Sequence, residues 1–215
     1  MEKIKKIMIH SLDNKNINKL NNYLANINDK NKTELTFDDG LYSQYKYFNY
    51  LKDVNLKKIY FISTGIIRPL LNIPNNKILS SEICHSNAFA NDFNDFMNYD
   101  EIFNLNNPYL NSFIGLHGHY HILFLGKTKS GKRTKYKVSI FNKIKELSYL
   151  EFFQLYRDDV IQMKNSYINK KIQIRHFCYP YNIEIPLYRD LIYKYLDTDK
   201  KFIFYGNERE DLEHL

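Results

Sequence analysis

Three short clusters in the sequence hold residue types that can carry metal-dependent chemistry. The first is Thr36–Gly40 (TFDDG), in which two carboxylates, Asp38 and Asp39, are adjacent in the chain. Adjacent carboxylates repel each other unless a cation divides their roles, so that one binds the metal and the other stays free as a base. The same residues also suit a simple turn, in which aspartate and glycine serve only the backbone geometry.

The second cluster is His117–His121 (HGHYH), which follows an apolar run. His117 and His121 share a face if the segment is helical, whereas His117 and His119 share one if it is extended. This density of histidines at a strand end favours a metal site over isolated surface or core histidines. Two histidines and one aspartate are a sound ligand set for Zn²⁺ or a comparable divalent ion, with one position open for water.

The third cluster, Phe177–Asn182 (FCYPYN), places aromatic residues around Pro180. Aromatic rings at a strand end can line a sugar-binding groove, because they stack on flat apolar faces. A packed turn explains the same residues and is the favoured interpretation on this cluster alone. A sugar-binding groove stays open as the alternative.

Apolar runs alternate with amphipathic stretches along the chain, and each cluster follows an apolar run. Strands are predicted at Lys6–His10, Glu34–Phe37, Lys58–Thr64, Phe113–Leu116, Ile172–Phe177 and Phe202–Tyr205. Helices are predicted at Asn16–Asn28, Tyr45–Val54, Tyr99–Leu105, Tyr149–Tyr167 and Leu187–Leu196. This alternation predicts an α/β fold with a mostly parallel sheet, open or closed into a barrel. Functional residues gather at strand ends in either arrangement.

The composition is that of an ordinary globular protein rather than of a disordered or collagen-like chain. The 215 residues are 44% apolar and 26% charged, which predicts one domain over residues 1–215. Cys84 and Cys178 lie far apart and suggest no disulfide framework. The sequence shows neither a signal-peptide core nor an apolar run long enough to span a membrane. A cytoplasmic location is the resulting expectation.

Charge is concentrated in two segments of the chain, one basic and one acidic. Much of the formal net charge of +7 comes from the segment 126–137, which is predicted to be a solvated basic loop. No helix-turn-helix, RNA-recognition or zinc-finger pattern accompanies this charge, so no nucleic-acid partner is predicted. Nucleic-acid binding remains an alternative that would be strongly salt-dependent. The acidic segment 207–215 is expected to be a flexible tail.

Taken in order, the three clusters resemble the three motifs of the polysaccharide deacetylases, the NodB-homology group of carbohydrate esterase family four. Thr36–Gly40 resembles the first motif, and the histidine pair within His117–His121 resembles the second. Phe177–Asn182 resembles the third motif in its Phe-Ala-Tyr-Pro-Tyr-Gly form, and Tyr60–Gly65 matches the strand that follows the first motif. The resemblance runs from about residue 6 to residue 205 and implies a distorted (β/α) barrel of about seven strands.

The resemblance also implies roles for individual residues. Asp38 would be the catalytic base, while Asp39, His117 and His121 would hold a divalent metal ion, zinc first, with cobalt, nickel or manganese as alternatives. The backbone N–H of Tyr181 would help to hold the oxyanion. The activity implied is hydrolysis of an N-acetyl (N-acyl) group from an amino sugar in a glycan or glycan precursor.

Two features depart from the commoner form of the family. The segment Ile7–Ser11 resembles a strand end that carries a histidine in the branch with this third motif, so His10 is the predicted general acid. An ordinary strand-end histidine is the alternative. Cys178 stands where an arginine often orients the base, and Arg175 or Arg209 are the candidates to replace it.

Four further residues lie close to the motifs. Tyr179, Pro180, Tyr120 and His119 are predicted to contact the substrate, although His119 is additional to the family pattern. Two alternative functions stay open at this stage. One is hydrolysis of another C–N bond on the same scaffold, and the other is carbohydrate binding by a catalytically impaired relative.

Overall fold

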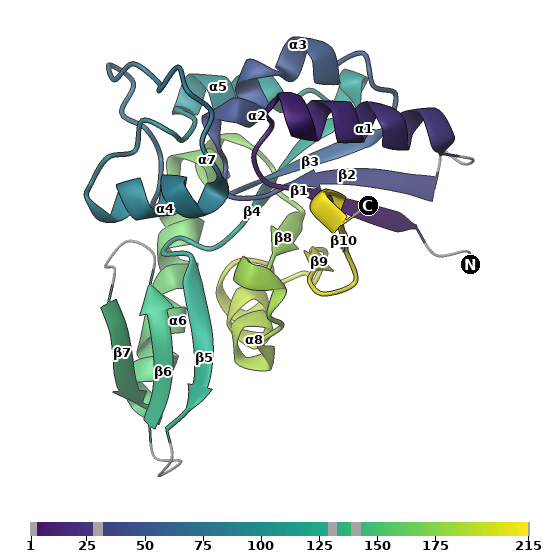
Figure 1. Cartoon of the computed structure of the whole chain (residues 1–215). Coiled ribbons are helices and arrows are strands. Elements are labelled where there is room, and N and C mark those ends of the chain that lie inside the picture. Colours follow the sequence, from purple (N-terminus) through teal and green to yellow (C-terminus); the bar gives the residue numbers. More distant parts are fainter. Residues whose placement is uncertain (1–3, 28–31, 129–132, 139–142, 215) are drawn as a thin grey trace.

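The main element of the fold is a curled, seven-stranded parallel sheet (Figure 1). The computed structural model describes residues 4–27, 32–128, 133–138 and 143–214. The strand order is β10-β1-β2-β3-β4-β8-β9, so β10 and β9 form the two edges. The strands are β1 (Lys5–Ile9), β2 (Thr33–Phe37), β3 (Lys57–Ile62), β4 (Ser112–Leu116), β8 (His176–Cys178), β9 (Ile203–Tyr205) and β10 (Glu210–Asp211). The predicted distorted α/β barrel is therefore confirmed, in the form of an open half-barrel.

Helices cover the sheet on two sides. The helices are α1 (Asn14–Asn26), α2 (Tyr42–Lys46), α3 (Phe48–Leu51), α4 (Ser81–Phe89), α5 (Tyr99–Leu105), α6 (Tyr149–Asn165), α7 (Tyr167–Lys171) and α8 (Pro186–Tyr195). Figure 1 shows α1, α2, α3 and α5 together on one side, while α6 and α8 pack against each other on the other side. None of the helices in the described part of the chain is both long and apolar enough to cross a membrane.

The local sequence explains most of these elements. The strands β2 and β3 lie at the centre of the sheet, and the Phe37 and Tyr60 rings stack between them with centroids 4.6 Å apart. Capping boxes start α5, at Asn98, and α6, at Ser148, because each cap side chain and a glutamate three residues later satisfy backbone N–H groups reciprocally.

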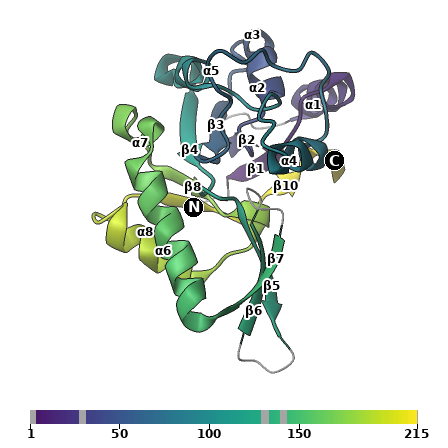
Figure 2. The ribbon, with the colours of Figure 1, turned by 90° about the vertical axis from the view of Figure 1, so that its left-hand side faces the viewer.

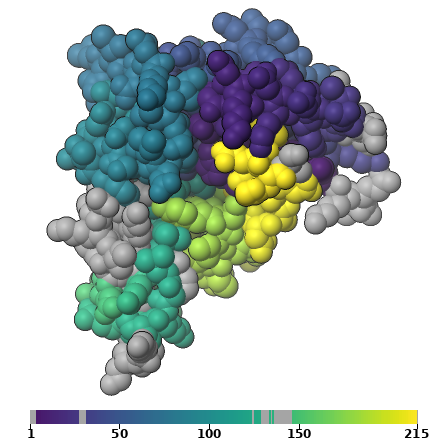
Figure 3. All heavy atoms as spheres, in the orientation of Figure 1, coloured from purple at the N-terminus to yellow at the C-terminus, as the bar shows by residue number. Residues whose placement is uncertain are grey.

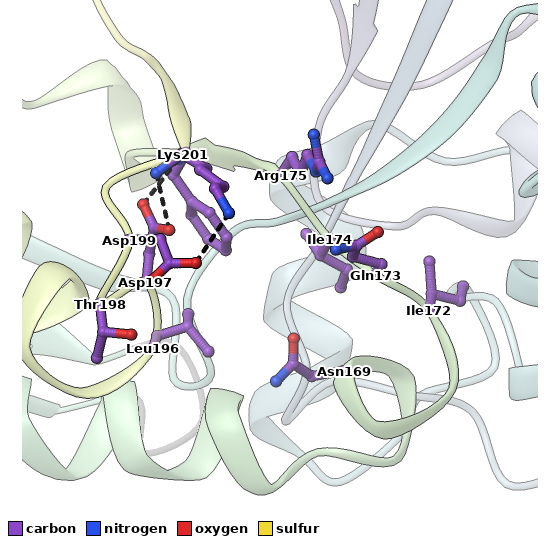
Figure 4. Close-up of a pocket in the computed structure, with 11 residues that line it drawn as sticks. Asn169, Ile172, Gln173, Ile174, Arg175, Leu196, Asp197, Thr198, Asp199 and Lys201 are labelled. Atoms are coloured by element: carbon purple, nitrogen blue, oxygen red, sulfur yellow. Dashed lines mark hydrogen bonds and ion pairs between the residues drawn. The ribbon is translucent and has the colours of Figure 1, made fainter.

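Two predicted elements are shorter than expected. The predicted helix Tyr45–Val54 is divided between α2 and α3, since Tyr47 has φ −95° and ψ 13°, outside the α-helical region. The predicted strand Ile172–Phe177 pairs only over β8. Its earlier residues, including Arg175, instead line a surface cavity of about 260 Å³ at the amino-terminal ends of β8 and β9 (Figure 4).

A separate three-stranded antiparallel sheet follows the histidine cluster and was not predicted. It consists of β5 (Ile122–Lys127), β6 (Arg133–Val138) and β7 (Lys143–Ser148), and Figure 2 shows it extending below the main sheet beside α6. The predicted basic loop 126–137 is thus largely two paired strands, and its residues 129–132 lie outside the described residues. Arg133 and Lys135 are exposed and lie near Glu151 and Glu146.

The carboxyl-terminal segment is ordered against the sheet, contrary to the predicted flexible tail. β10 pairs in parallel with β1, and Leu212 is only 1% exposed. Figure 3 shows this segment, in yellow, packed between the amino-terminal segment and the green segment that follows β8. Its charged residues made it resemble a solvated tail, but two of its glutamates, Glu208 and Glu210, form ion pairs with Lys6 and Lys5 of β1.

Candidate active site

The three motifs meet at the carboxyl ends of the parallel strands, around a cavity of about 320 Å³. The parallel register of Ile9 with Phe37 brings His10 beside Asp38, and the Asp38 N–H donates to the Ile9 carbonyl at 3.0 Å. The cavity is lined by His10, Asp38, Asp39, Ser81, Glu82, His85, Phe89, His117, His121, Leu123, Tyr181 and Asn182. The residues predicted as base, metal ligands, oxyanion donor and acid therefore all line the same cavity.

Asp39 is the residue on which the histidines converge. Its Oδ1 lies 3.2 Å from His85 Nε2, 3.2 Å from His121 Nε2 and 3.5 Å from His117 Nε2. Its other oxygen, Oδ2, accepts a hydrogen bond from the Ser81 hydroxyl, which fixes the carboxylate plane. Burial opposes ionisation of Asp39, but the nearby histidines, His85 above all, outweigh it and hold its pKa well below the usual value.

The ligand histidines are held with their Nε2 atoms toward Asp39. His117 Nδ1 lies 3.0 Å from the carbonyl oxygen of Cys178. Because a carbonyl can only accept, Nδ1 carries a proton and donates it, which turns Nε2 toward the Asp39 carboxylate. Burial would lower the pKa of His117, but Cys178, Asp39 and Asp38 around the ring outweigh it and raise that pKa well above its usual value. Burial, with a smaller contribution from nearby His85, lowers the pKa of His121 to about 3, so that ring is neutral at neutral pH. Histidine nitrogens gathered around one carboxylate oxygen form a donor set of the kind that holds a divalent ion.

The distances among these donor atoms fit a divalent ion. With metal–ligand distances of about 2.1 Å, two ligand atoms lie about 3.0 Å apart at right angles and about 3.4 Å apart at the tetrahedral angle. The observed separations from Asp39 Oδ1 are 3.2 Å for His85 and His121, within this range, and 3.5 Å for His117, slightly above it. The donor atoms of Asp39, His85 and His121 also lie within 4.8 Å of one another. Nitrogen and oxygen donors of this kind suit zinc, cobalt and nickel.

A second close group, formed by Asp38, His117 and Cys178, is a poor metal site. Both oxygens of Asp38 accept hydrogen bonds from Arg209, at 2.6 Å each. Burial raises the pKa of the Cys178 thiol, and a protonated thiol is not a metal ligand. The two adjacent aspartates are therefore divided as the sequence suggested, with Asp39 toward the histidines and Asp38 toward a protein cation.

Arg209 takes the place of the arginine that the third motif lacks. Its guanidinium, wholly buried, forms a bidentate pair with Asp38 and also donates to Asn182 Oδ1 and, at 3.2 Å, to Thr36 Oγ1. Burial alone would raise the pKa of Asp38, but Arg209 and then His117 outweigh it and lower the pKa below its usual value. Asp38 is therefore ionised at neutral pH.

The other candidate, Arg175, does not lie beside Asp38 and so cannot orient it. It lines the separate cavity at the amino-terminal end of β8, where Figure 4 shows it with Asp199 and Lys201, which form an ion pair. Sequence spacing could not decide between the two arginines, because Arg209 is 171 positions from Asp38 in the chain.

Several residues of the site have left-handed backbone angles. Asp39 has φ 74° and His121 has φ 50°, while Tyr181 and Asn182 have φ 57° and 59°. Non-glycine residues adopt this region rarely, and strained positions of this kind cluster at functional sites. Asn182, which replaces the glycine of the motif, tolerates these angles better than most residues.

The loop between the two ligand histidines is fixed by a buried carboxylate that sequence analysis missed. Asp159 of α6 accepts the backbone N–H groups of His119 and Tyr120, at 3.0 and 2.7 Å, and the Tyr188 hydroxyl. Gly118, with φ 81°, turns the chain here, and a Cβ on it would lie 3.0 Å from the Tyr188 hydroxyl oxygen. Asp159 thus positions the loop that carries His121.

We expect Asp159→Ala to lower the free energy of unfolding by about 3 kcal/mol or more. It would leave two buried N–H groups and one buried hydroxyl unpaired, and each such group costs about 1–3 kcal/mol. Asp159→Asn, which keeps an acceptor oxygen, should lose less. Urea denaturation of both variants measures the difference, and equal stability of Asp159→Ala and the wild type would contradict this role.

The same carboxyl predicts a pH dependence. Burial raises the pKa of Asp159 to about 6, above the value of about 3.9 in an unfolded chain. The folded state thus binds more protons between pH 4 and 6, and the contribution of this group to stability falls as the pH rises through that window. Asp159→Asn should lack this fall, which denaturation curves at pH 4, 5, 6 and 7 would measure.

The four residues predicted to contact the substrate lie outside the cavity lining, whereas Tyr181 is part of it. Tyr181 lies on the cavity wall, 41% exposed, with its ring centroid 4.6 Å from that of His121. Tyr179 is instead a core residue, 1% exposed, whose hydroxyl accepts from Arg189 Nε at 3.0 Å. His119 Nδ1 lies 2.8 Å from the Thr64 hydroxyl and its ring packs against Tyr120. None of Tyr179, Pro180, Tyr120 and His119 lines the cavity.

His85 was not predicted as a site residue. The sequence between Gly65 and Tyr99 carries no clear periodicity, so no element was assigned there, yet it contains α4. The only signal was the spacing of Ser81 and His85, four residues apart, which places both on one helix face.

His10, which was predicted, does line the cavity, and its carbonyl accepts from Gln44 Nε2 at 2.9 Å. His214 is exposed and lies off the cavity wall.

The curled parallel sheet, with an aspartate pair after β2 and a histidine pair after β4, is the arrangement that the motif resemblance predicted for a NodB-like barrel. No family model matches the chain, and no curated protein matches it by sequence.

Solved structures do share the fold. IcaB from Ammonifex degensii superposes with a TM-score of 0.59 at 13% identity, over 99% of this chain and 86% of that one. The deacetylase domain of BpsB from Bordetella bronchiseptica gives 0.57 at 13% identity, over 90% and 86%. A de-N-acetylase from Aggregatibacter actinomycetemcomitans gives 0.54 at 15% identity, over 97% and 77%. The resemblance found in the motifs thus holds for the fold.

Proposed function

We propose that this chain is a metal-dependent hydrolase that removes an N-acetyl (N-acyl) group from an amino sugar in a glycan or glycan precursor. The observation that carries the proposal is the division of the aspartate pair. Asp39 faces the Nε2 atoms of His117 and His121, while Asp38 is ionised and held by Arg209 in the same cavity. Two structural neighbours, a de-N-acetylase and a deacetylase domain, support the same activity.

Asp39, His117 and His121 would hold the divalent ion, for which we propose zinc, with cobalt, nickel or manganese as alternatives. When bound, the ion would lower the pKa of a coordinated water and polarise the acyl oxygen. Asp38 Oδ2 lies 4.0 Å from His117 Nε2, so the base is next to the ion position without being a ligand.

The protein residues would then carry the protons. Asp38 takes a proton from the water as its oxygen bonds to the acyl carbon. The backbone N–H of Tyr181, at the cavity rim, would donate to the oxyanion that forms. As the C–N bond breaks, His10 gives a proton to the departing nitrogen, and the products are acetate and a free amino sugar. The cavity of about 320 Å³ suits recognition of a single sugar unit.

The test is metal analysis combined with an assay of acetate and free amine released from N-acetylglucosamine oligomers of several linkages. The wild type should bind about one ion per chain and release both products in equal amounts. Asp39→Ala and His117→Ala should lose metal and activity while keeping the circular dichroism spectrum of the wild type. Metal binding without any release would favour a carbohydrate-binding protein, and absence of metal uptake would overturn the proposal.

The role proposed for His10 has its own test. His10→Gln should slow hydrolysis of the N-acetyl sugar, because the amine leaves poorly without a proton, by about 10²-fold or more. It should leave hydrolysis of p-nitrophenyl acetate nearly unchanged, because nitrophenolate departs without protonation. Equal losses with both substrates would mean that His10 only supports the structure of the site.

A further inference from the structure

We propose that His85 of α4 is a fourth protein ligand of the metal ion, so that the ion is held by one aspartate and three histidines. This inference rests on the proposed metal site and adds to it a residue outside the three motifs. It follows from the position of the His85 ring, from its missing partners and from the way in which α4 is attached to Asp39.

The position of the ring is that of a ligand. His85 Nε2 lies 3.2 Å from Asp39 Oδ1, the same distance as His121 Nε2. The His85 and His121 rings are stacked, with centroids 4.4 Å apart and planes 17° apart. One ring nitrogen of each histidine and one carboxylate oxygen of Asp39 lie within 4.8 Å of one another. Both rings therefore direct the same nitrogen to the same small volume.

The two ring nitrogens of His85 are buried without a hydrogen bond in the described part of the chain. His85 is 8% exposed, and neither Nδ1 nor Nε2 has a hydrogen-bond partner of good geometry in the described part of the chain. A buried polar group left unpaired destabilises the folded state. A metal–nitrogen bond at Nε2 would satisfy the atom that faces Asp39.

The helix that carries His85 is built around this contact. Ser81, one turn before His85, donates to Asp39 Oδ2, so one face of α4 contacts both oxygens of the carboxylate. Cys84 and Ala88, on the adjoining part of the same side of α4, are buried in a small apolar cluster with Phe96. Phe96 also packs edge-on against the His85 ring, with centroids 5.6 Å apart. The ring orientation is thus fixed by packing.

A fourth protein ligand restricts which ions leave room for chemistry. A tetrahedral zinc site with four protein ligands is closed, whereas catalytic sites keep a position for water. With His85 bound, open positions exist only on an ion with five or six ligands. Three nitrogen donors suit zinc, cobalt and nickel better than manganese. We therefore expect the bound ion, zinc included, to have five or six ligands rather than four.

The first measurement counts imidazole ligands in the unmodified chain. Pulsed electron paramagnetic resonance of the Cu²⁺-loaded wild type should detect three coordinated imidazoles, and His85→Asn should show two. Titration with Co²⁺ should give a dissociation constant at least about tenfold weaker for His85→Asn and His85→Ala, since even partners outside the ligand shell are worth 10–100-fold. His176→Gln, another buried histidine away from the cavity, is the matched control and should bind Co²⁺ as the wild type does.

The outcomes separate this inference from the proposed function. Two imidazoles in the wild type, with unchanged Co²⁺ affinity in both His85 variants, would overturn the role of His85 and leave the metal site of Asp39, His117 and His121 intact. No metal uptake by the wild type would overturn the proposed function itself. The count in the wild type needs no variant, so a His85 variant that fails to fold does not prevent the test.

Discussion

Replacing Asp38 by asparagine should lower kcat for N-acetyl sugar hydrolysis by about 10²–10⁴-fold, the range typical for loss of a general base. Both oxygens of Asp38 are fixed by Arg209, and its carboxylate is ionised, so it can accept a proton in a defined direction. Asparagine has nearly the same shape but cannot take up a proton. The metal content should stay the same, because Asp38 does not face the histidine nitrogens as Asp39 does.

The matched control is Asp39→Asn, which makes the same change at the adjacent position. It should lose metal as well as activity, whereas Asp38→Asn should lose activity alone. Because Arg209 loses its anionic partner in Asp38→Asn, kinetics should be measured at a temperature at which circular dichroism shows the variant to be folded. Unchanged turnover in a folded, metal-loaded Asp38→Asn would contradict the assignment of the base.

Replacing Arg209 by methionine should lower the free energy of unfolding by about 3–5 kcal/mol, the usual cost of removing one partner from a buried ion pair. The guanidinium is wholly buried, and the carboxylate of Asp38 is nearly so. Methionine keeps most of the side-chain volume, so the loss reports mainly the unpaired charge. Urea denaturation at pH 7 measures it.

A double-mutant cycle identifies the cause. Arg209→Met combined with Asp38→Asn removes both charges and should be more stable than Arg209→Met alone. The pH dependence gives a second check. Arg209 holds the folded pKa of Asp38 below its unfolded value, so this stabilisation is present above about pH 4 and is lost as the pH falls through the folded pKa. The gap between the wild type and Arg209→Met should therefore narrow at acid pH. A gap that is independent of pH would mean that Arg209 acts through packing.

The motif residues could be placed from the sequence because their arrangement follows from strand order alone. Asp38, Asp39 and His117 each follow an apolar run, and the carboxyl ends of parallel strands meet at one edge of a sheet. Hydrophobic pattern was sufficient for the fold class. The individual roles proposed for Asp38, Asp39, His117 and His121 came from the family resemblance and stay predictions.

The residues that complete the site could not be found in this way. His85 lies on a short helix that is held by tertiary contacts rather than by an amphipathic pattern, and Arg209 lies in a charged segment that resembles a solvated tail. Both depend on partners distant in the chain, which a single sequence does not pair. Tyr179 shows the converse error, since its place next to a motif suggested a substrate contact while its ring belongs to the core.

The position of Arg209 beside β10 has a consequence for how the site comes into being during synthesis. His10 follows β1 and Arg209 precedes β10, far apart in the chain, yet both lie near Asp38. A nascent chain that has folded as far as Tyr205 would contain Asp39, His85, His117 and His121 but not the guanidinium that holds both oxygens of Asp38. Orientation of Asp38 therefore requires the segment around β10 to be made and to dock beside β1. A protease cut between Tyr205 and Arg209 would separate the residue that orients Asp38 from the part of the chain that carries Asp39 and the histidines.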